Sequence, residues 1–335
     1  MVLTYIKHVC ITLLVFLYSS SILANTDVRI LVDISGSMKQ NDPNNLRQPA
    51  IELLIDLLAD DSKAGIWSFG EYVNMLVKHD VVNEDWRKKA KAELANISNL
   101  GQRTNLGEVL QKAAFDFDYS TYQSGTQFIL LTDGMVDISK KEQENELERD
   151  RILTQLLPLF AKKEAVLHTI ALSDSADLLL LEQMALKTSG VADIAYNADD
   201  LMPIFLRALD SFQEQPRLPI NDNVFLVDER VQEITALIFH DSQSVVLQAP
   251  SSKKLDRFAL DDNVNWKATE QYDLITIKRP EAGNWKIDGQ LGPLSRISVL
   301  SDLNLEVTPL SNNVFDMDLP QIKAWLLSEE ALVKD

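Results

Sequence analysis

Two aspartates and three hydroxyl side chains occupy three separate segments of the chain, and their types suit metal binding. Asp33, Ser35 and Ser37 lie in one turn directly after an apolar run. Thr104 lies in a polar loop, and Asp133 ends a second apolar run. Carboxylate and hydroxyl oxygens are ligands of hard divalent cations, and a set with so few carboxylates favours Mg²⁺ or Mn²⁺. If the three segments meet, the sequence predicts a site for one of these ions.

The elements around these residues are expected to be alternating strands and helices. Residues 28–34 and 127–133 are short, continuous apolar runs, which are typical of strands buried on both faces. Further strands are expected at 65–69, 73–82, 166–172 and 192–197, and helices at 46–58, 85–97, 106–116, 148–163, 177–188 and 199–212. This alternation indicates an α/β fold with a doubly wound, mostly parallel sheet. Ligands bind at the carboxyl strand ends of such sheets, where both aspartates would lie.

These motifs make residues 25–213 resemble a von Willebrand factor type A (vWA) domain, a Rossmann-like fold, of the bacterial exported type. Asp33-x-Ser35-x-Ser37, Thr104 and Asp133 match the three segments of that family's metal-ion-dependent adhesion site (MIDAS). The resemblance implies that Ser35, Ser37 and Thr104 bind the metal through their hydroxyls. It also implies that Asp33 and Asp133 bind directly or through water, and that a partner's acidic side chain fills the open coordination position.

The loop before Thr104 departs from the family, in which this loop is often rich in glycine. Here Gln102 and Arg103 precede the threonine. Arg103 brings a cation close to the site, where it would either pair with a bound acid or weaken the affinity for metal. Two other interpretations stay open: that the motif residues only form turns and helix caps, or that the site folds without binding metal.

The composition excludes some classes of function. The chain has 335 residues, enough for two or three domains, and its 46% hydrophobic content allows buried cores. Lys and Arg number 32 and Asp and Glu number 50, which gives a formal charge of -18. Such a surface repels polyanions, so no nucleic-acid partner is expected. The histidines that follow residue 24, namely His79, His168 and His240, are dispersed along the chain and predict no zinc site.

The first 24 residues have the features of a signal peptide. They contain Lys7 and no acidic residue, an apolar run over residues 9–18, and a cleavage site after Ala24. That run is too short to span a bilayer, and no later stretch reaches roughly 18 consecutive apolar residues. We therefore expect an exported protein of the periplasm or cell surface with no further membrane span. Removal of the segment takes away Cys10, the only cysteine, so disulfides are not expected.

The second half of the chain has a different pattern. Residues 214–223 are polar and contain two prolines, which predicts a linker. Residues 224–312 show short alternating segments separated by turn residues, which is typical of an immunoglobulin-like β-sandwich domain, with Trp285 in its core. Residues 313–335 form a C-terminal segment too short for a domain, which predicts a short helix or the start of a further domain.

The leading hypothesis is a non-enzymatic binding module that captures a Glu or Asp carboxylate of a protein partner through Mg²⁺ or Mn²⁺. A second hypothesis is a structural or assembly protein of the cell envelope, whose metal site is vestigial or only stabilises the fold. A metal-dependent hydrolase is disfavoured, because the motif places no general base besides the ligands themselves. The partner, the biological process and the oligomeric state are not defined by the sequence.

Overall fold

A computed structural model of the chain describes residues 26–196, 198–213, 215–241, 244–258, 260–301, 303–308, 322–328 and 331–332. The expected signal peptide, residues 1–24, lies outside these ranges, so export stays a prediction. Among the helices of the described ranges, none combines the length and the apolar character needed to cross a bilayer.

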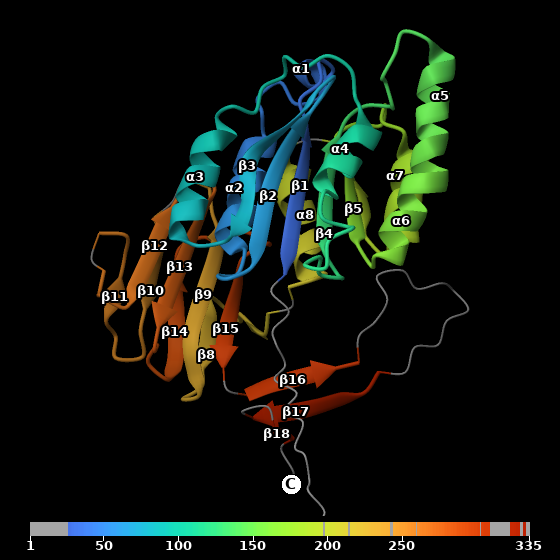
Figure 1. The fold of residues 1–335 in the computed structure, drawn as a ribbon. Coiled ribbons are helices and arrows are strands. Elements are labelled where there is room, and N and C mark those ends of the chain that lie inside the picture. Colours follow the sequence, from blue (N-terminus) through green and yellow to red (C-terminus); the bar gives the residue numbers. More distant parts are fainter. Residues whose placement is uncertain are drawn as a thin grey trace, which may run out of the picture.

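The first unit, residues 26–213, is built on a six-stranded sheet with the order β3-β2-β1-β4-β5-β6 (Figure 1). The β2–β3 pair is antiparallel, and the pairs β1–β2, β1–β4, β4–β5 and β5–β6 are parallel. The strands are β1 (Asp27–Asp33), β2 (Lys63–Phe69), β3 (Val73–Val81), β4 (Gln127–Thr132), β5 (Val166–Ala171) and β6 (Ala192–Ile194). The expected α/β fold with a mostly parallel sheet is confirmed.

Helices cover both faces of this sheet, because successive strand residues point to opposite sides. Ile30 and Val32 of β1 join the buried cluster formed with α2, α3 and α8, whereas Leu31 joins the cluster formed with α4, α6 and α7. The helices are α1 (Met38–Asn41), α2 (Arg47–Leu57), α3 (Glu84–Leu94), α4 (Leu106–Ala113), α5 (Glu142–Arg151), the π-helix η1 (Ile152–Leu156), α6 (Leu157–Lys162), α7 (Leu178–Lys187) and α8 (Ala198–Asp210). The helix expected at 148–163 therefore begins at Glu142 and contains a π-helical turn.

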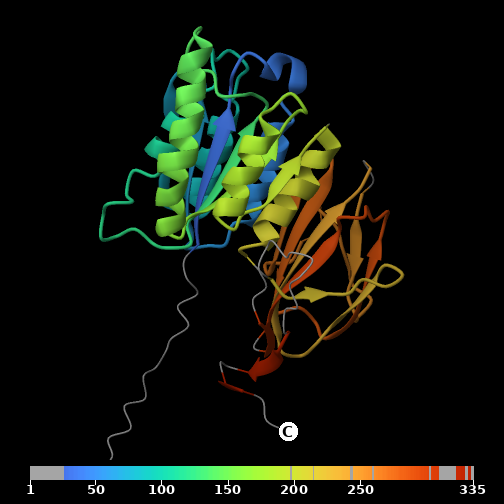
Figure 2. The same cartoon turned by 90° about the vertical axis from the view of Figure 1, so that its right-hand side faces the viewer.

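The second unit is an antiparallel β-sandwich (Figure 2). Its two sheets have the orders β11-β10-β14-β8 and β12-β13-β9-β15-β7. Trp285 is buried between them, as expected, and its indole Nε1 donates to the carbonyl of Glu281 at 2.8 Å. The strands are β7 (Arg217–Leu218), β8 (Val224–Val227), β9 (Val231–Phe239), β10 (Val246–Gln248), β11 (Lys254–Leu255), β12 (Val264–Ala268), β13 (Tyr272–Lys278), β14 (Gly283–Asp288) and β15 (Arg296–Ser301).

Strand pairing groups the second half differently from the boundaries expected from sequence. Within the expected linker, 214–223, β7 pairs with β15 and so belongs to the sandwich. Within the expected sandwich range, 224–312, β16 (Leu303–Val307) pairs instead with β17 (Ala324–Ser328), which also pairs with β18 (Ala331–Leu332). An alternating pattern predicts a strand but not its partner, which explains the departure at β16, whereas β7 has only two residues and is too short to show such a pattern. Residues 313–321, 329–330 and 333–335 lie outside the described ranges.

The two units share one buried apolar cluster. Phe239 of β9 and Tyr272 of β13 belong to the same cluster as the inner faces of α2 and α8. Lys267 of β12 donates to Glu52 of α2 at 2.8 Å and also pairs with Asp56 of that helix. Burial alone would lower the pKa of Lys267, but the hydrogen bonds to these two carboxylates raise it overall. The sandwich is therefore fixed against the first unit by both apolar packing and ion pairs.

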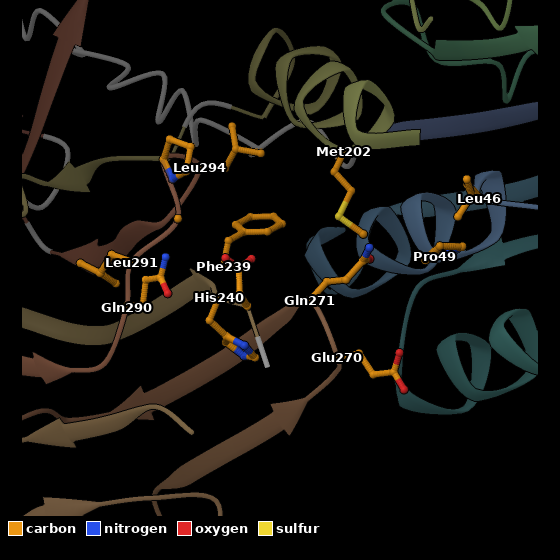
Figure 3. A pocket seen from close by; sticks show the side chains of 13 residues that line it. Leu46, Pro49, Met202, Phe239, His240, Glu270, Gln271, Gln290, Leu291 and Leu294 are labelled. Atoms are coloured by element: carbon orange, nitrogen blue, oxygen red, sulfur yellow. The ribbon is translucent and has the colours of Figure 1, made fainter. Parts of the chain in front are cut away.

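A cavity of about 590 Å³ lies between the two units (Figure 3). Its first wall comes from Leu46 and Pro49 at the start of α2 and from Met202 of α8. Its second wall includes Phe239 and Leu294 of the sandwich. None of the five predicted metal ligands lines this cavity.

Candidate metal centre

Parallel pairing of β1 with β4 brings two of the predicted site segments to one edge of the sheet. Val32 of β1 is in register with Leu131 of β4, so Asp33 and Asp133 follow at adjacent strand ends. Both side chains are almost completely buried. The expectation that these two aspartates meet at the carboxyl edge agrees with this register, and α1 lies above the same edge (Figure 1).

The carboxylate of Asp33 is held in a fixed orientation. It accepts hydrogen bonds from the Ser35 backbone N–H at 2.8 Å and from the Thr132 hydroxyl at 2.6 Å. Burial raises the pKa of Asp33 to about 6; these hydrogen bonds oppose the rise, and the nearby charge of Asp133 adds to it. The ionised carboxylate therefore lacks sufficient positive charge around it, which a bound cation would supply.

The second carboxylate, that of Asp133, is surrounded by donors from the segment after β1. The Ser37 hydroxyl donates to its Oδ1 at 2.8 Å, and the Ser35 hydroxyl lies 3.4 Å from the same oxygen. The two serine hydroxyls are 3.0 Å apart. Asn41, the last residue of α1, donates to Oδ2 at 2.9 Å. Asn41 did not emerge from the sequence, because a four-residue helix has too few positions to show a periodic pattern.

Thr104 reaches the same place from the loop that precedes α4. Its backbone pairs with that of Asp137 through hydrogen bonds of 2.9 and 3.1 Å. Its hydroxyl lies 3.0 Å from the position that a Cβ atom on Gly134 would occupy. The helix cap next to it is Asn105, whose side chain accepts from the Glu108 N–H. Thr104 therefore does not cap this helix.

Arg103 has an acidic partner within its own neighbourhood. Its guanidinium forms an ion pair with Asp137 at 2.8 Å. Its backbone has a φ of 59°, in the left-handed region that is unfavourable for most residues. Asp137 also pairs with the backbone of Thr104. The segment around Asp137 is therefore attached to the Thr104 loop both by this ion pair and by backbone hydrogen bonds.

Arg47, the first residue of α2, is the main residue near the site that sequence reasoning missed. Its side chain is completely buried and donates to the backbone carbonyl of Asp33 and to the side chain of Asn99. It also donates to Asp42 at 2.7 Å, and burial lowers its pKa. One side chain therefore connects the end of β1, the loop after α1 and the loop that leads to Thr104. In the sequence it stands at the start of an ordinary amphipathic helix, where an arginine usually faces solvent.

The five predicted residues offer two carboxylates and three hydroxyls, a donor set that fits a hard divalent cation. Within the described ranges, no group of three or more His, Cys, Asp or Glu side chains is arranged to hold a metal. The predicted set contains only two such residues, so it depends on its hydroxyls. This composition leaves a bound dication only just neutralised, which suits an additional acidic ligand.

The fold and this edge define a class: an α/β domain that carries a MIDAS-like set of oxygen donors at the carboxyl ends of its strands. The family model of the von Willebrand factor type A domain matches residues 27–209, more than half of the chain. The chain therefore belongs to the von Willebrand factor type A family, and the family assignment made from the motif residues is confirmed. Domains of this family are typically interaction modules rather than enzymes.

Several solved structures are similar to the chain, whereas no curated protein matches it. A von Willebrand factor type A protein from Catenulispora acidiphila is 15% identical, with a TM-score of 0.47, over 82% of this chain and 64% of that one. Proximal thread matrix protein 1 from the mussel byssus, described with a zinc-occupied MIDAS motif, is 18% identical, with a TM-score of 0.41, over 56% and 48%. VWA2, an ArnB paralog from Sulfolobus acidocaldarius, is 17% identical, with a TM-score of 0.40, over 83% and 66%. The chain thus spans less than two thirds of the length of each of these proteins.

Proposed function

We propose that this protein is an exported binding module that captures a Glu or Asp side chain of a protein partner through a divalent metal, Mg²⁺ or Mn²⁺. The observation that carries the proposal is the grouping of Ser35, Ser37 and Asp133 within hydrogen-bond distance at one edge of the sheet. Asp33 and Thr104 adjoin this group through Thr132 and Gly134.

Each residue of the set has a distinct proposed role. Ser35, Ser37 and Thr104 would bind the cation through their hydroxyls, while Asp33 and Asp133 would bind it directly or through water. The bound cation would supply an electropositive point for a carboxylate from outside the chain. Ser37 is the exposed member of the set, so the open position is expected on its side.

Calorimetric titration of the purified protein with Mg²⁺ and with Mn²⁺ tests the proposal. We expect saturable binding that is lost in the Asp33→Ala and Thr104→Ala variants and kept in Asp118→Asn, which changes an exposed aspartate outside the site. A partner recovered from an extract should be released by EDTA. Capture that survives both EDTA and Asp33→Ala would overturn the proposal.

A second function is supported by the hydrogen bonds within the site. Asp133 accepts from both Ser37 and Asn41, so its carboxylate has partners without a metal. This favours, as the alternative, a structural or assembly protein in which the site only stabilises the fold. The Ser35→Ala variant separates the two functions: retained partner binding with a lowered melting temperature supports the structural role, and lost binding at an unchanged melting temperature supports capture.

Export is a separate part of the proposal and needs its own test. The supporting feature is the apolar run over residues 9–18, preceded by Lys7 and followed by three serines at 19–21 and a small residue, Ala24, at the expected cleavage site. Mass spectrometry of the protein recovered from the periplasm or medium should give a chain that begins at Asn25. An unprocessed chain found only in the cytoplasm would contradict export.

A further inference from the structure

Three large apolar side chains are exposed in the loops that adjoin the candidate metal centre. Tyr72, Leu100 and Met135 have 72%, 77% and 56% of their surface accessible. Isolated exposed apolar residues are common, but several grouped around one polar site indicate an interaction surface. We call these three residues the apolar collar.

Backbone contacts place two members of the collar next to the segment after β1. Leu100 precedes Gly101, whose N–H donates to the carbonyl of Ile34 at 2.8 Å. Tyr72 lies in the turn after β2, and its carbonyl accepts from the Gly70 N–H at 3.1 Å. Gly70 in turn packs on the loop of Gly101, because a Cβ on Gly70 would lie 3.4 Å from the Gly101 Cα. The two loops therefore adjoin each other and the segment that carries Ser35.

Met135 borders the centre at the strand end of β4. It follows Gly134, the residue that approaches the Thr104 hydroxyl. The three members of the collar thus belong to three loops that border the same edge of the sheet: the β2–β3 turn, the loop before α4, and the segment after β4.

The charges on the chain limit the long-range attraction between this edge of the sheet and an acidic partner. The formal charge of the whole chain is -18, which disfavours an acidic partner at long range. The nearby Arg103 is already engaged by Asp137, so it does not add to the attraction that the bound metal exerts on a carboxylate. Short-range apolar contacts must then supply much of the affinity, because each well-buried apolar side chain contributes substantially on binding.

We infer that the partner presents its carboxylate next to an aromatic or large aliphatic side chain, which packs on Tyr72, Leu100 and Met135. The occupant is a segment of a second, net neutral or basic protein whose sequence contains Glu or Asp beside such a residue. This inference rests on the proposed function, since it requires the metal-bound carboxylate as the central contact, and it defines the chemistry of the neighbouring contact.

Two fluorescently labelled peptides test the inference by anisotropy in the presence of Mg²⁺. One contains Gly-Glu-Phe-Gly and the other Gly-Glu-Gly-Gly, with identical flanking residues. We expect the Phe peptide to bind about tenfold more tightly than the Gly peptide, the size of a typical interface contact. Leu100→Ala and Met135→Ala should each remove most of this difference. Leu226→Ala, which truncates a 62% exposed leucine on β8 of the sandwich, serves as the matched control and should leave it unchanged.

The possible results separate the inference from the proposed function. Equal, Mg²⁺-dependent binding of both peptides would overturn the inference and leave the metal-dependent capture intact. Binding of the Phe peptide that persists in EDTA would also overturn it, because the collar would then act without the carboxylate contact. Failure of both peptides to bind in Mg²⁺ would count against the proposed function together with the inference. Because the truncated residues are exposed, unchanged melting temperatures should accompany every variant.

Discussion

Replacing Asp33 with asparagine is expected to stabilise the metal-free protein at neutral pH and to abolish its response to metal. Burial raises the pKa of Asp33 from 3.8 to about 6. At about 1.4 kcal/mol for each pKa unit, this shift corresponds to about 3 kcal/mol. The folded state holds the proton on Asp33 more tightly than the unfolded state does. Protonated Asp33 therefore stabilises the folded state by this amount below pH 3.8, and the stabilisation is lost as the pH rises through 6. The neutral amide of D33N avoids that loss.

The gain in the free energy of unfolding of D33N is reduced by changes in hydrogen bonding. Asp33 accepts from the Ser35 N–H and the Thr132 hydroxyl, and an amide can accept only through its oxygen. Thr132 would have to turn and accept from the new amide N–H₂, at a cost of about 1 kcal/mol. The expected net gain in the free energy of unfolding is then about 2 kcal/mol above pH 7.

Urea unfolding in EDTA and in Mg²⁺ measures this effect, with Asp118→Asn as the control. In EDTA at about pH 7.5, D33N should be more stable than wild type, and at about pH 5 its advantage should fall by roughly 1 to 2 kcal/mol, because wild-type Asp33 is then largely protonated. Mg²⁺ should stabilise wild type and the control but not D33N. The reasoning is refuted if D33N is less stable than wild type in EDTA by the same amount at both pH values.

Three further substitutions give independent checks. Burial lowers the pKa of His168 to about 4, so the folded state keeps this ring neutral and loses stability as the pH falls from 6.5 toward 4. In H168Q about 3 kcal/mol of that loss should be absent. Equal pH dependence of urea unfolding in wild type and H168Q would contradict this prediction. R47M should lower the free energy of unfolding by about 3 to 5 kcal/mol, because it leaves the buried Asp42 without its cation. R47K should recover part of this free energy in the same assay. A loss below about 1 kcal/mol in R47M would count against the role given to Arg47. G134A places a Cβ 3.0 Å from the Thr104 hydroxyl. It should weaken Mg²⁺ binding in calorimetry about tenfold at a nearly unchanged melting temperature. An unaltered affinity would count against Thr104 as a metal ligand.

The elements that carry the candidate site could be predicted from the sequence because they are buried strands. Residues 28–34 and 127–133 are continuous apolar runs, and they form β1 and β4 side by side. Parallel strands bring their carboxyl ends to one edge, so the placement of Asp33 and Asp133 at that edge could be predicted. The pairing of β1 with β4, which brings the two residues close together, is known only from the structure. The metal ligation itself stays a prediction.

Other features depend on tertiary contacts that no local pattern encodes. Arg47 stands where an amphipathic helix usually places a solvated residue, yet the convergence of three loops buries it. β16 has the alternation expected of a sandwich strand, but it pairs with β17 about 20 residues further along the chain. The short β7 has too little apolar content to be distinguished from a linker until its pairing with β15 is known.

The shared core of the two units affects how such a protein can evolve by recombination of its domains. Phe239 and Tyr272 pack in one apolar cluster with residues of α2 and α8, and Lys267 pairs with Asp56 across the same boundary. A gene rearrangement that joined residues 26–213 to an unrelated neighbour would leave this apolar surface in water and Asp56 without one of its cationic partners. The sandwich cannot be exchanged as a freely portable module, so the two units are expected to change together, through paired substitutions on both sides of their boundary.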